Sequence, residues 1–191
     1  ESSGVSEQDR QRFEVITVKS WNDDDLGSHF AGATAVISCL GNRQIFIGSW
    51  DSNEGNQAII KTMKTNKITR AVVISSSGVE EDWPPMEFFW GGKILAFLFL
   101  TIGRQAFHDL TMMERAYRES DLDYLLVRPV GIGEDVVPLG EWYLQKEKYK
   151  DVLSCNMAKL DLARFMVEEA INPSKHAEAV VVGAKSPSTN T

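Results

Sequence analysis

Three consecutive serines followed by a glycine, Ser75, Ser76, Ser77 and Gly78, come directly after an apolar, β-branched segment. A serine hydroxyl at the end of a buried strand can donate a hydrogen bond to a substrate carbonyl, on whose oxygen negative charge develops during hydride transfer. The same hydroxyls can instead cap the backbone of the turn after the strand, because serine side chains bond readily to nearby backbone groups. The residues alone leave both interpretations open.

A second candidate is Gly32-Ala33-Thr34, which begins like a glycine-rich phosphate-binding turn. Such a turn follows a strand and precedes a helix, because the phosphate rests on the helix N-terminus. Here the order is reversed: Leu26 and Phe30 lie at helical spacing before Gly32, and the apolar run 34–40 follows it. We therefore interpret Gly32 as the residue that ends a short helix.

The serines must be positioned by the elements around them, and the chain alternates between predicted strands and helices. Apolar and β-branched runs predict strands at 13–18, 34–40, 70–75, 122–128 and 179–182. Apolar residues at helical spacing predict helices over 24–31, 53–66 and 106–117. A last helix is predicted to begin at the N-cap candidate Asp161 and to bury Ala163, Met166, Val167 and Ala170. This alternation indicates a parallel sheet covered by helices on both faces.

In such a sheet, ligands bind at the carboxyl ends of the strands. Four segments are predicted to lie there, and they offer hydroxyls, backbone N–H groups or glycines: Ser20 to Asn22, Cys39 to Gly41, Ser75 to Gly78 and Pro129 to Gly131. Because consecutive strands joined by a helix tend to pair, we also expect 70–75 and 122–128 to be adjacent parallel strands.

Composition narrows the class of protein. A chain of 191 residues, 43% hydrophobic and 25% charged, fits one globular domain, which we assign to residues 13–185 between polar tails at 1–12 and 186–191. The net charge of -7 argues against a nucleic-acid or anionic-membrane surface. Cys39 and Cys155 are far apart, so we expect no disulfide framework, no metal site and a reducing compartment of unknown identity.

Two segments resemble a known family. The sequences NEGNQAIIKTMKTNKITRAVVISSSGV (53–79) and MERAYRESDLDYLLVRPVGI (113–132) are similar to the NAD(P)H-binding, NmrA-like branch of the atypical short-chain dehydrogenases/reductases, which includes the flavin/biliverdin reductases. The likeness extends over nearly all of 13–184, with AGATAVISCLG resembling the fourth strand and AKLDLARFMVEEAI the last helix. It implies a doubly wound, mostly parallel, Rossmann-like α/β fold and an NADP or NAD cofactor.

The resemblance also implies roles for single residues. Ser76 matches the strand-end serine near the nicotinamide and would be the catalytic residue, and Ser75 and Ser77 are neighbours that could substitute for it. Three residues match the segment that contacts the nicotinamide amide: Pro129, Val130 and Gly131.

On the adenosine side, Leu40 and Gly41 match the backbone that passes the adenosine and the pyrophosphate. Ser20 stands where the family usually has an acidic residue beside the adenine, which weakens that contact. The usual Tyr-x-x-x-Lys pair is absent, so proton donation falls to solvent or to another group. His108 and Asp109 lie on the helix where such a donor would sit.

The larger departure from the family pattern concerns its N-terminal part. The family begins with a strand, a Gly-x-x-Gly-x-x-Gly turn, a helix and a second strand, whereas Phe13 to Val18 already matches the third strand. We therefore expect strands 1 and 2 to be missing from the 191 residues. We also expect these residues alone to bind a dinucleotide weakly, because the turn that holds the pyrophosphate is missing with them.

Two functions remain open at this stage. The first is NAD(P)-dependent reduction of a planar, quinone-like or other small carbonyl substrate. The second is a non-catalytic scaffold or assembly subunit that docks a protein or membrane partner through the aromatic and apolar segment Trp83 to Leu100. That segment is too short to span a bilayer and can equally be an apolar lid over the substrate or simple core.

Overall fold

The computed structural model describes residues 12–21, 26–41, 51–80, 101, 103–133, 135–146, 153–154 and 156–185. Its centre is one sheet with the strand order β1 (Ala35–Ser38), β2 (Arg70–Ile74), β3 (Asp123–Pro129), β8 (Glu178–Lys185) and β5 (Tyr143–Leu144). The first four strands of this order are parallel, whereas β5 and the short β6 (Leu153–Ser154) run antiparallel to β8. A separate parallel pair joins β4 (Ile132–Gly133) to β7 (Met157–Ala158).

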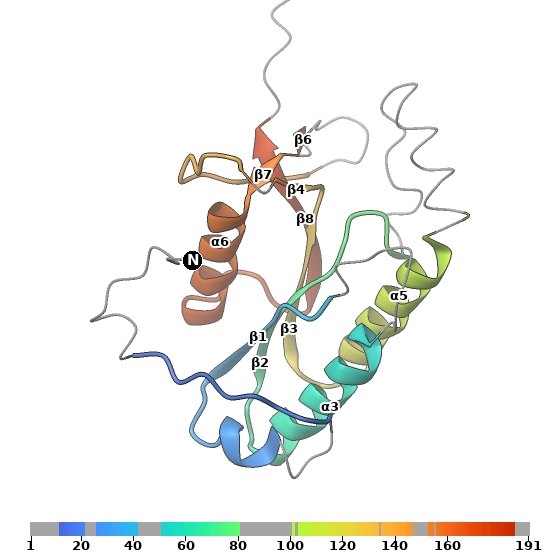
Figure 1. Ribbon diagram of the computed structural model, residues 1–191, viewed down its shortest axis with the longest axis vertical. Helices are drawn as coiled ribbons and strands as arrows, with labels where there is room; N and C mark the ends of the chain where they lie inside the picture. The colour runs from blue at the N-terminus through green and yellow to red at the C-terminus, as the bar shows by residue number, and fades with distance from the viewer. Residues whose placement is uncertain are drawn as a thin grey trace, which may run out of the picture.

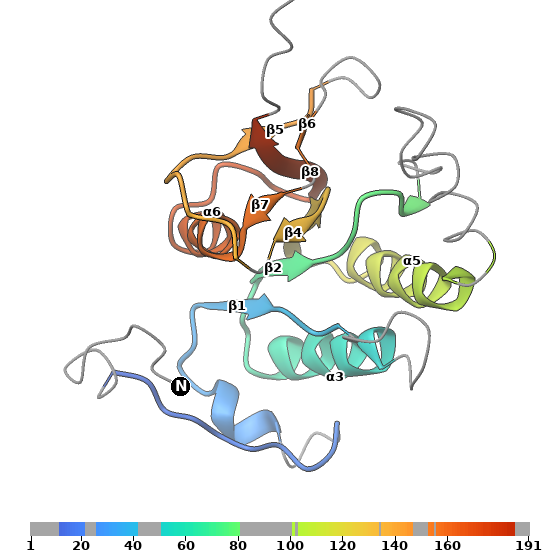
Figure 2. The same cartoon turned by 45° about the horizontal axis from the view of Figure 1, so that its top comes forward.

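Helices cover both faces of this sheet. Helices α3 (Ser52–Thr65) and α5 (Arg104–Arg118) lie side by side on one face, and α6 (Lys159–Ile171) lies on the other (Figures 1 and 2). Each side has its own core, with Met63, Met113 and Tyr117 under α3 and α5 and with Phe165 and Met166 under α6. The predicted α/β architecture with a mostly parallel sheet is therefore confirmed.

Strands β2 and β3 form the middle of the sheet. They pair in parallel register from Arg70 opposite Asp123 to Ile74 opposite Val127, which confirms the predicted adjacency. Along β2, Ala71 and Val73 pack in the core under α3 and α5, and Val72 packs in the core under α6. Because both faces are covered, these strands are apolar along nearly their whole length rather than alternating.

The N-terminal part of the chain differs from the prediction. Residues Phe13 to Val18 form no strand, and their side chains are largely exposed, with Val15 at 90%. Alternation and β-branching show that a segment suits a sheet, but a strand also needs a neighbour to pair with. Of the predicted helix over 24–31, residues 24 and 25 lie outside the described residues, Leu26 is helical, and the 3₁₀ helix η1 (Gly27–Phe30) follows it. Gly32 comes two residues after η1 at a φ of +80°, as its interpretation as a terminating glycine requires.

The buried face of α6 also differs from the prediction. Met166 is buried as predicted, but Ala163 and Val167 are exposed. The helix begins at Lys159, so Asp161 is not its N-cap; its carboxylate instead accepts hydrogen bonds from the backbone N–H groups of Leu139 and Gly140. Polar side chains with such partners can be buried, which the apolar pattern alone does not reveal.

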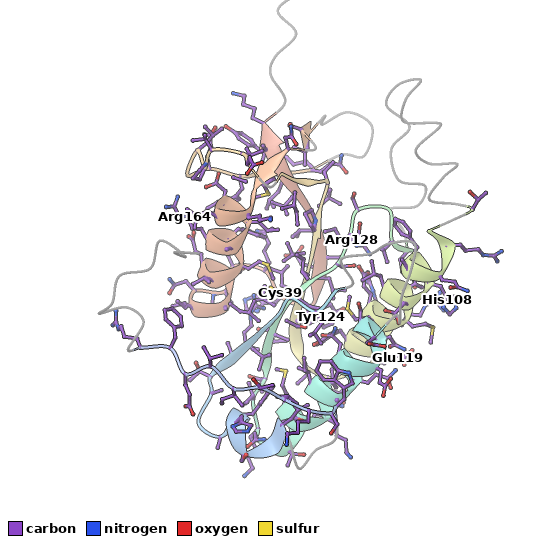
Figure 3. All side chains as sticks on the ribbon, viewed as in Figure 1. Cys39, His108, Glu119, Tyr124, Arg128 and Arg164 are labelled. Carbon is purple, nitrogen blue, oxygen red and sulfur yellow. The ribbon has the colours of Figure 1, made fainter. Side chains whose placement is uncertain are left out.

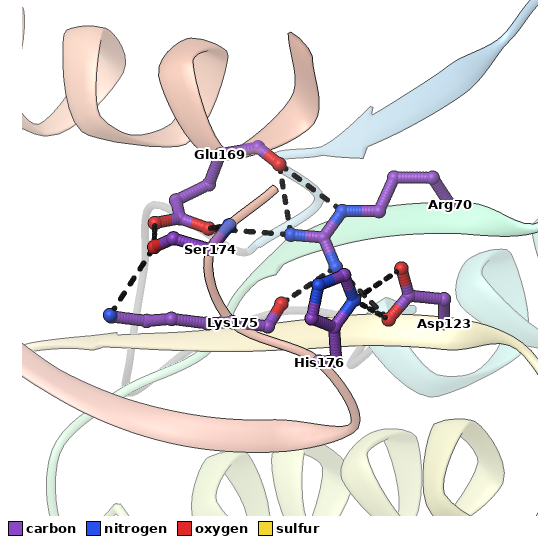
Figure 4. A network of polar contacts seen from close by, with 6 residues as sticks. All are labelled: Arg70, Asp123, Glu169, Ser174, Lys175 and His176. Carbon is purple, nitrogen blue, oxygen red and sulfur yellow. Dashed lines mark hydrogen bonds and ion pairs between the residues drawn. The ribbon is translucent and has the colours of Figure 1, made fainter. Parts of the chain in front are cut away.

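At the amino end of the sheet, the side chain of Arg70 binds the chain around the end of α6 (Figure 4). Its Nε and Nη2 donate to the carbonyl oxygen of Glu169 at 3.2 and 2.9 Å, and its Nη1 donates to the carbonyl oxygen of Lys175 at 2.9 Å. The guanidinium also lies 3.2 Å from a carboxylate oxygen of Asp123, which in turn contacts His176. One buried arginine therefore joins β2, β3 and the segment between α6 and β8.

The Glu169 carboxylate completes this network. Burial alone raises the pKa of Glu169, but hydrogen bonds from Ser174 and the positive charge of Lys175 outweigh it and hold the pKa below the usual value. The ionised form is therefore the one that the folded state stabilises.

We predict that Arg70→Met lowers the free energy of unfolding by about 3 kcal/mol, because two carbonyl groups and two carboxylates lose a buried donor. Urea unfolding measures the loss. The control is Arg115→Met, which removes an arginine whose ion pair with Glu80 is exposed and should change stability little. A loss for Arg70→Met no larger than that of the control would show that the network does not hold the amino end together.

Candidate active site

Two of the predicted ligand segments meet at the carboxyl ends of β2 and β3. The backbone N–H of Ser75 donates to the carbonyl oxygen of Val127 at 2.7 Å, and that of Ser77 donates to the carbonyl oxygen of Pro129 at 3.3 Å. The parallel pairing thus continues past Ile74, the last residue of β2. The serine turn and the segment after β3 consequently lie side by side, as expected of neighbouring strand ends.

The three serines differ in their surroundings. Ser75 is buried, and its hydroxyl donates to Oε1 of Glu114 at 2.6 Å. Ser76 is only partly buried, and its hydroxyl donates to the adjacent Ser77 carbonyl at 3.2 Å. The hydroxyl of Ser75 is therefore committed to the protein interior, whereas Ser76 keeps a partly exposed position at the strand end.

The segment after β3 is held on two sides. The Val130 N–H donates to the carbonyl oxygen of Val182 in β8 at 3.0 Å, and the Gly131 carbonyl accepts from the Met157 N–H at 3.1 Å. Pro129 and Val130 are thereby fixed beside the serine turn.

Leu40 and Gly41, which were predicted for the adenosine side, follow β1, the strand next to β2. The Leu40 side chain packs against the start of α3, where a Cβ on Gly55 would lie 2.7 Å from Leu40 Cδ1 and 3.3 Å from the ring of Trp21. Ser20, which is exposed, precedes that tryptophan. Gly41 is also exposed and has open space around it. The structure thus places Leu40 and Trp21, the neighbour of Ser20, near the same end of α3.

Sequence reasoning did not identify the buried polar groups beneath these strand ends. The Asn56 side chain, fully buried on α3, accepts hydrogen bonds from Ser38 at 2.7 Å and from the Tyr117 hydroxyl at 2.9 Å. Glu114, fully buried on α5, binds Ser75 and Arg128. Glu114 lies in the segment 113–132 that resembles the family, but the resemblance implied no role for it.

Helix α5 carries one tyrosine, which is poorly placed for proton donation. Tyr117 is fully buried, bonds to Asn56, and has its pKa raised above the usual value by burial. His108 lies on the exposed side of α5 (Figure 3), which does not favour the role of a proton donor at the strand ends. Leu110 is partly buried and packs against the core.

Asp109 acts on the neighbouring helix instead. Its two carboxylate oxygens lie 3.4 and 3.3 Å from the backbone N–H of Asn53, in the first turn of α3. A carboxylate is favourable at a helix N-terminus, but burial is the largest influence on Asp109 and raises its pKa despite the hydrogen bonds from Asn53 and Ser52. The N-terminus of α3 is therefore already occupied by a protein carboxylate.

A groove of about 620 Å³ lies elsewhere, on the outer surface between α3 and α5. It is lined by the middle and C-terminal parts of both helices and by the two residues after α5: Gln57, Ile60, Lys61, Lys64, Met112, Arg115, Ala116, Glu119 and Ser120. This groove is thus separate from the strand-end residues. Within the described residues, no helix has the length and hydrophobicity needed to cross a bilayer.

Comparison with known families agrees with this geometry. Residues 2–173 match the family described as NAD(P)H-binding. The chain belongs to this NAD(P)H-binding family. The predicted resemblance is confirmed at this level, as is the expectation of an NAD(P)-binding Rossmann-like fold. No curated protein matches the sequence significantly.

Solved structures share the fold of this family member at low sequence identity. A short-chain dehydrogenase/reductase from Veillonella parvula in complex with NADP is 17% identical, with a TM-score of 0.63 over 89% of this chain and 70% of that one. A putative NADH-flavin reductase from Streptococcus pneumoniae is 17% identical, with a TM-score of 0.62 over 90% and 81%. An anaerobillin reductase from Escherichia coli is 20% identical, with a TM-score of 0.59 over 82% and 66%.

The comparisons do not support one expectation about this family member. Because the family match begins at residue 2, it gives no support to the prediction that strands 1 and 2 are missing. In the described part of the chain, β1 is the outermost strand on its side of the sheet. The segment Trp83 to Leu100 lies outside the described residues.

We predict that Asp109→Asn changes how stability depends on pH. An acid whose pKa is raised by folding destabilises the folded state above that pKa, and the penalty disappears as the pH falls through it. The variant keeps an oxygen acceptor for Asn53, so its melting temperature at pH 7 should equal or exceed that of the wild type, and the difference should vanish near pH 3.

Thermal unfolding at both pH values measures this effect. Asp121→Asn is the control, because Asp121 is exposed and asparagine also tolerates its φ of 56°. A clearly lower melting temperature of Asp109→Asn at pH 7, without such a change in the control, would show that the charge on Asp109 stabilises α3.

Proposed function

We propose that the protein is an NAD(P)H-dependent reductase whose substrate is a planar, conjugated acceptor such as a quinone or a flavin. The observation that carries this proposal is the combination of a partly exposed Ser76 at the end of β2 with an α5 whose single tyrosine is buried. Among the described residues, Ser76 offers a hydroxyl that can orient an acceptor, and α5 presents no accessible phenol to protonate it.

This combination selects the class of acceptor. The reduced nicotinamide supplies a hydride, which carries two electrons to the acceptor carbon or nitrogen. A simple ketone then becomes an alkoxide, which needs a positioned proton donor nearby. In a quinone or a flavin the new negative charge spreads over the conjugated system, so a hydrogen bond from Ser76 orients and stabilises it and water delivers the proton.

The strand ends fit the nicotinamide half of the cofactor. The fixed backbone of Pro129, Val130 and Gly131 would bind the amide of the nicotinamide, and the partly buried Ser76 and Ser77 would lie beside its ring. Ser75 would support this turn from the protein interior, because its hydroxyl is bound to Glu114. On the other side, Leu40, Gly41 and Ser20 would lie along the adenosine.

The pyrophosphate of the cofactor needs binding groups of its own. The 191 residues contain no Gly-x-x-Gly-x-x-Gly sequence, and in the described part of the chain Asp109 already binds the first turn of α3. We therefore propose that tight binding of NADPH or NADH needs a glycine-rich turn beside the outer edge of β1, which these residues do not supply.

The names of similar structures support a conjugated acceptor. The relatives from Streptococcus pneumoniae and Escherichia coli are named for a flavin and for anaerobillin. The alternative of a non-catalytic scaffold rests on Trp83 to Leu100, and no described residue adds an observation in its favour.

We predict that Ser76→Ala lowers kcat for reduction of a quinone or flavin by the full-length gene product at least about tenfold, because a hydrogen bond to the developing charge is lost. The dissociation constant of NADPH should stay nearly unchanged, since the hydroxyl acts on the acceptor. Stopped-flow absorbance of NADPH oxidation measures the rate, with the exposed Ser28→Ala as control. An unchanged kcat would remove Ser76 from the proposed role.

A further inference from the structure

Three adjacent strands carry a polar side chain near their carboxyl ends, and all three side chains point toward α3 and α5. They are Ser38 near β1's end, Ser75 after β2 and Arg128 in β3. Ser38 bonds to Asn56 of α3, and Ser75 and Arg128 both bond to Glu114 of α5. A buried polar layer thus lies directly beneath the strand ends that form the candidate site.

Glu114 is the centre of this layer. Its side chain has no exposed surface, and its Oε1 accepts from the Ser75 hydroxyl at 2.6 Å and from Arg128 Nε at 2.9 Å. Its Oε2 binds Arg128 Nη2 and lies 3.6 Å from Arg118 Nη2. One carboxylate therefore connects the ends of β2 and β3 to the same turn of α5.

The register of the sheet makes Ser75 and Arg128 neighbours. Ile74 is opposite Val127 in the parallel pair, so Ser75 and Arg128 are the next residues along the two strands. The backbone bond from Ser75 to Val127 continues the pairing at this step, and the bond from Ser77 to Pro129 follows two residues later. Glu114 thus bonds to both strands where the sheet passes into the ligand-binding turns.

The chemistry of this position requires a carboxylate. A buried arginine is costly unless a negative charge and well-placed acceptors surround it. An ionised glutamate provides two acceptor oxygens, and both are used here by Arg128, with Ser75 sharing one of them. A glutamine of the same size would present an NH₂ group, which cannot accept from a guanidinium.

We propose that Glu114 is a positioning residue, which acts through Ser75 and Arg128 to set Ser76 and the Pro129–Gly131 backbone for the nicotinamide and the acceptor. Because the Ser75 hydroxyl bonds to Glu114 of α5, the Ser75 side chain points into the protein interior. Ser76 is then the serine that remains at the strand end. Holding Arg128 fixes the residue directly before Pro129. The nicotinamide part of this inference rests on the proposed function, whereas the positioning of the two turns does not.

The first experiment is amide hydrogen exchange in the ligand-free, full-length gene product, followed by NMR. In Glu114→Gln, we expect exchange at the Ser75 and Ser77 amides to become at least about tenfold faster, with Val72 and Leu125 unchanged, because only the ends of the strands open. The control is Glu119→Gln, the same change at an exposed glutamate after α5. Unchanged exchange at the serines, or equally faster exchange everywhere, would overturn the proposal.

A second variant covers the case in which Glu114→Gln fails to fold. Ser75→Ala removes one hydrogen bond and leaves the ion pair with Arg128 in place, so the chain should fold. We expect faster exchange at Ser77 in this variant, with Val72 again unchanged. No change at Ser77 would contradict the coupling between Ser75 and the turn.

The second experiment separates the two halves of the cofactor. Calorimetry compares NADPH with 2′-phospho-ADP-ribose, which lacks the nicotinamide. For Glu114→Gln we expect the affinity for NADPH to fall about tenfold and the affinity for 2′-phospho-ADP-ribose to stay constant. This difference is expected if the substitution disturbs only the groups that contact the nicotinamide. An equal fall for both ligands would overturn the nicotinamide role. If the wild type binds neither ligand, the proposed function fails, and the exchange experiment still decides the positioning.

Discussion

The interaction on which the site depends is the buried ion pair between Glu114 and Arg128. A charge without exposed surface is tolerated only when its partners are fixed around it, so this pair determines where α5 lies relative to β2 and β3. The backbone that could bind a nicotinamide begins one residue beyond Arg128, and the serine turn begins with a hydroxyl bound to the same carboxylate. The geometry of the candidate ligand-binding edge thus depends on keeping this one buried charge paired.

A second buried arginine has the corresponding role at the opposite end of the sheet. Arg70 is the first residue of β2 and binds the chain around the end of α6, whereas Arg128 lies near the end of β3 and binds α5. The first arginine closes the amino end against the segment between α6 and β8. At the carboxyl end, the polar layer lies beneath the surface and leaves the turns above it accessible. The end that stays accessible is the carboxyl end, where ligands of parallel α/β sheets generally bind.

Much of the fold was predictable from local patterns. The continuous apolar runs of β2 and β3 identify strands that are buried on both faces. The helical spacing of apolar residues in α3 and α5 identifies helices with one buried face. Phe13 to Val18 shows the limit, because its pattern is that of a strand but no described neighbour pairs with it. In α6, the stripe was misplaced because Asp161 and Glu169 are buried with partners, which a hydrophobic pattern counts as surface.

The placement of the two strand-end turns beside each other was predictable for a physical reason. Parallel strands bring their carboxyl ends to one edge, so Ser76 and Gly131 could be placed near each other from sequence alone. What orients them could not, because Glu114 and Asn56 look like ordinary polar residues of exposed helix faces. Only the three-dimensional arrangement shows that both are fully buried.

The most direct test of the account is a titration of NADPH into the ¹⁵N-labelled, full-length gene product, followed by two-dimensional NMR. We expect the amide signals of Ser76, Ser77, Val130 and Gly131 to shift with one common dissociation constant, while those of Asp123 and His176 at the amino end stay in place. Shifts confined to the amino end or to the groove between α3 and α5, with the strand-end signals unchanged, would contradict it.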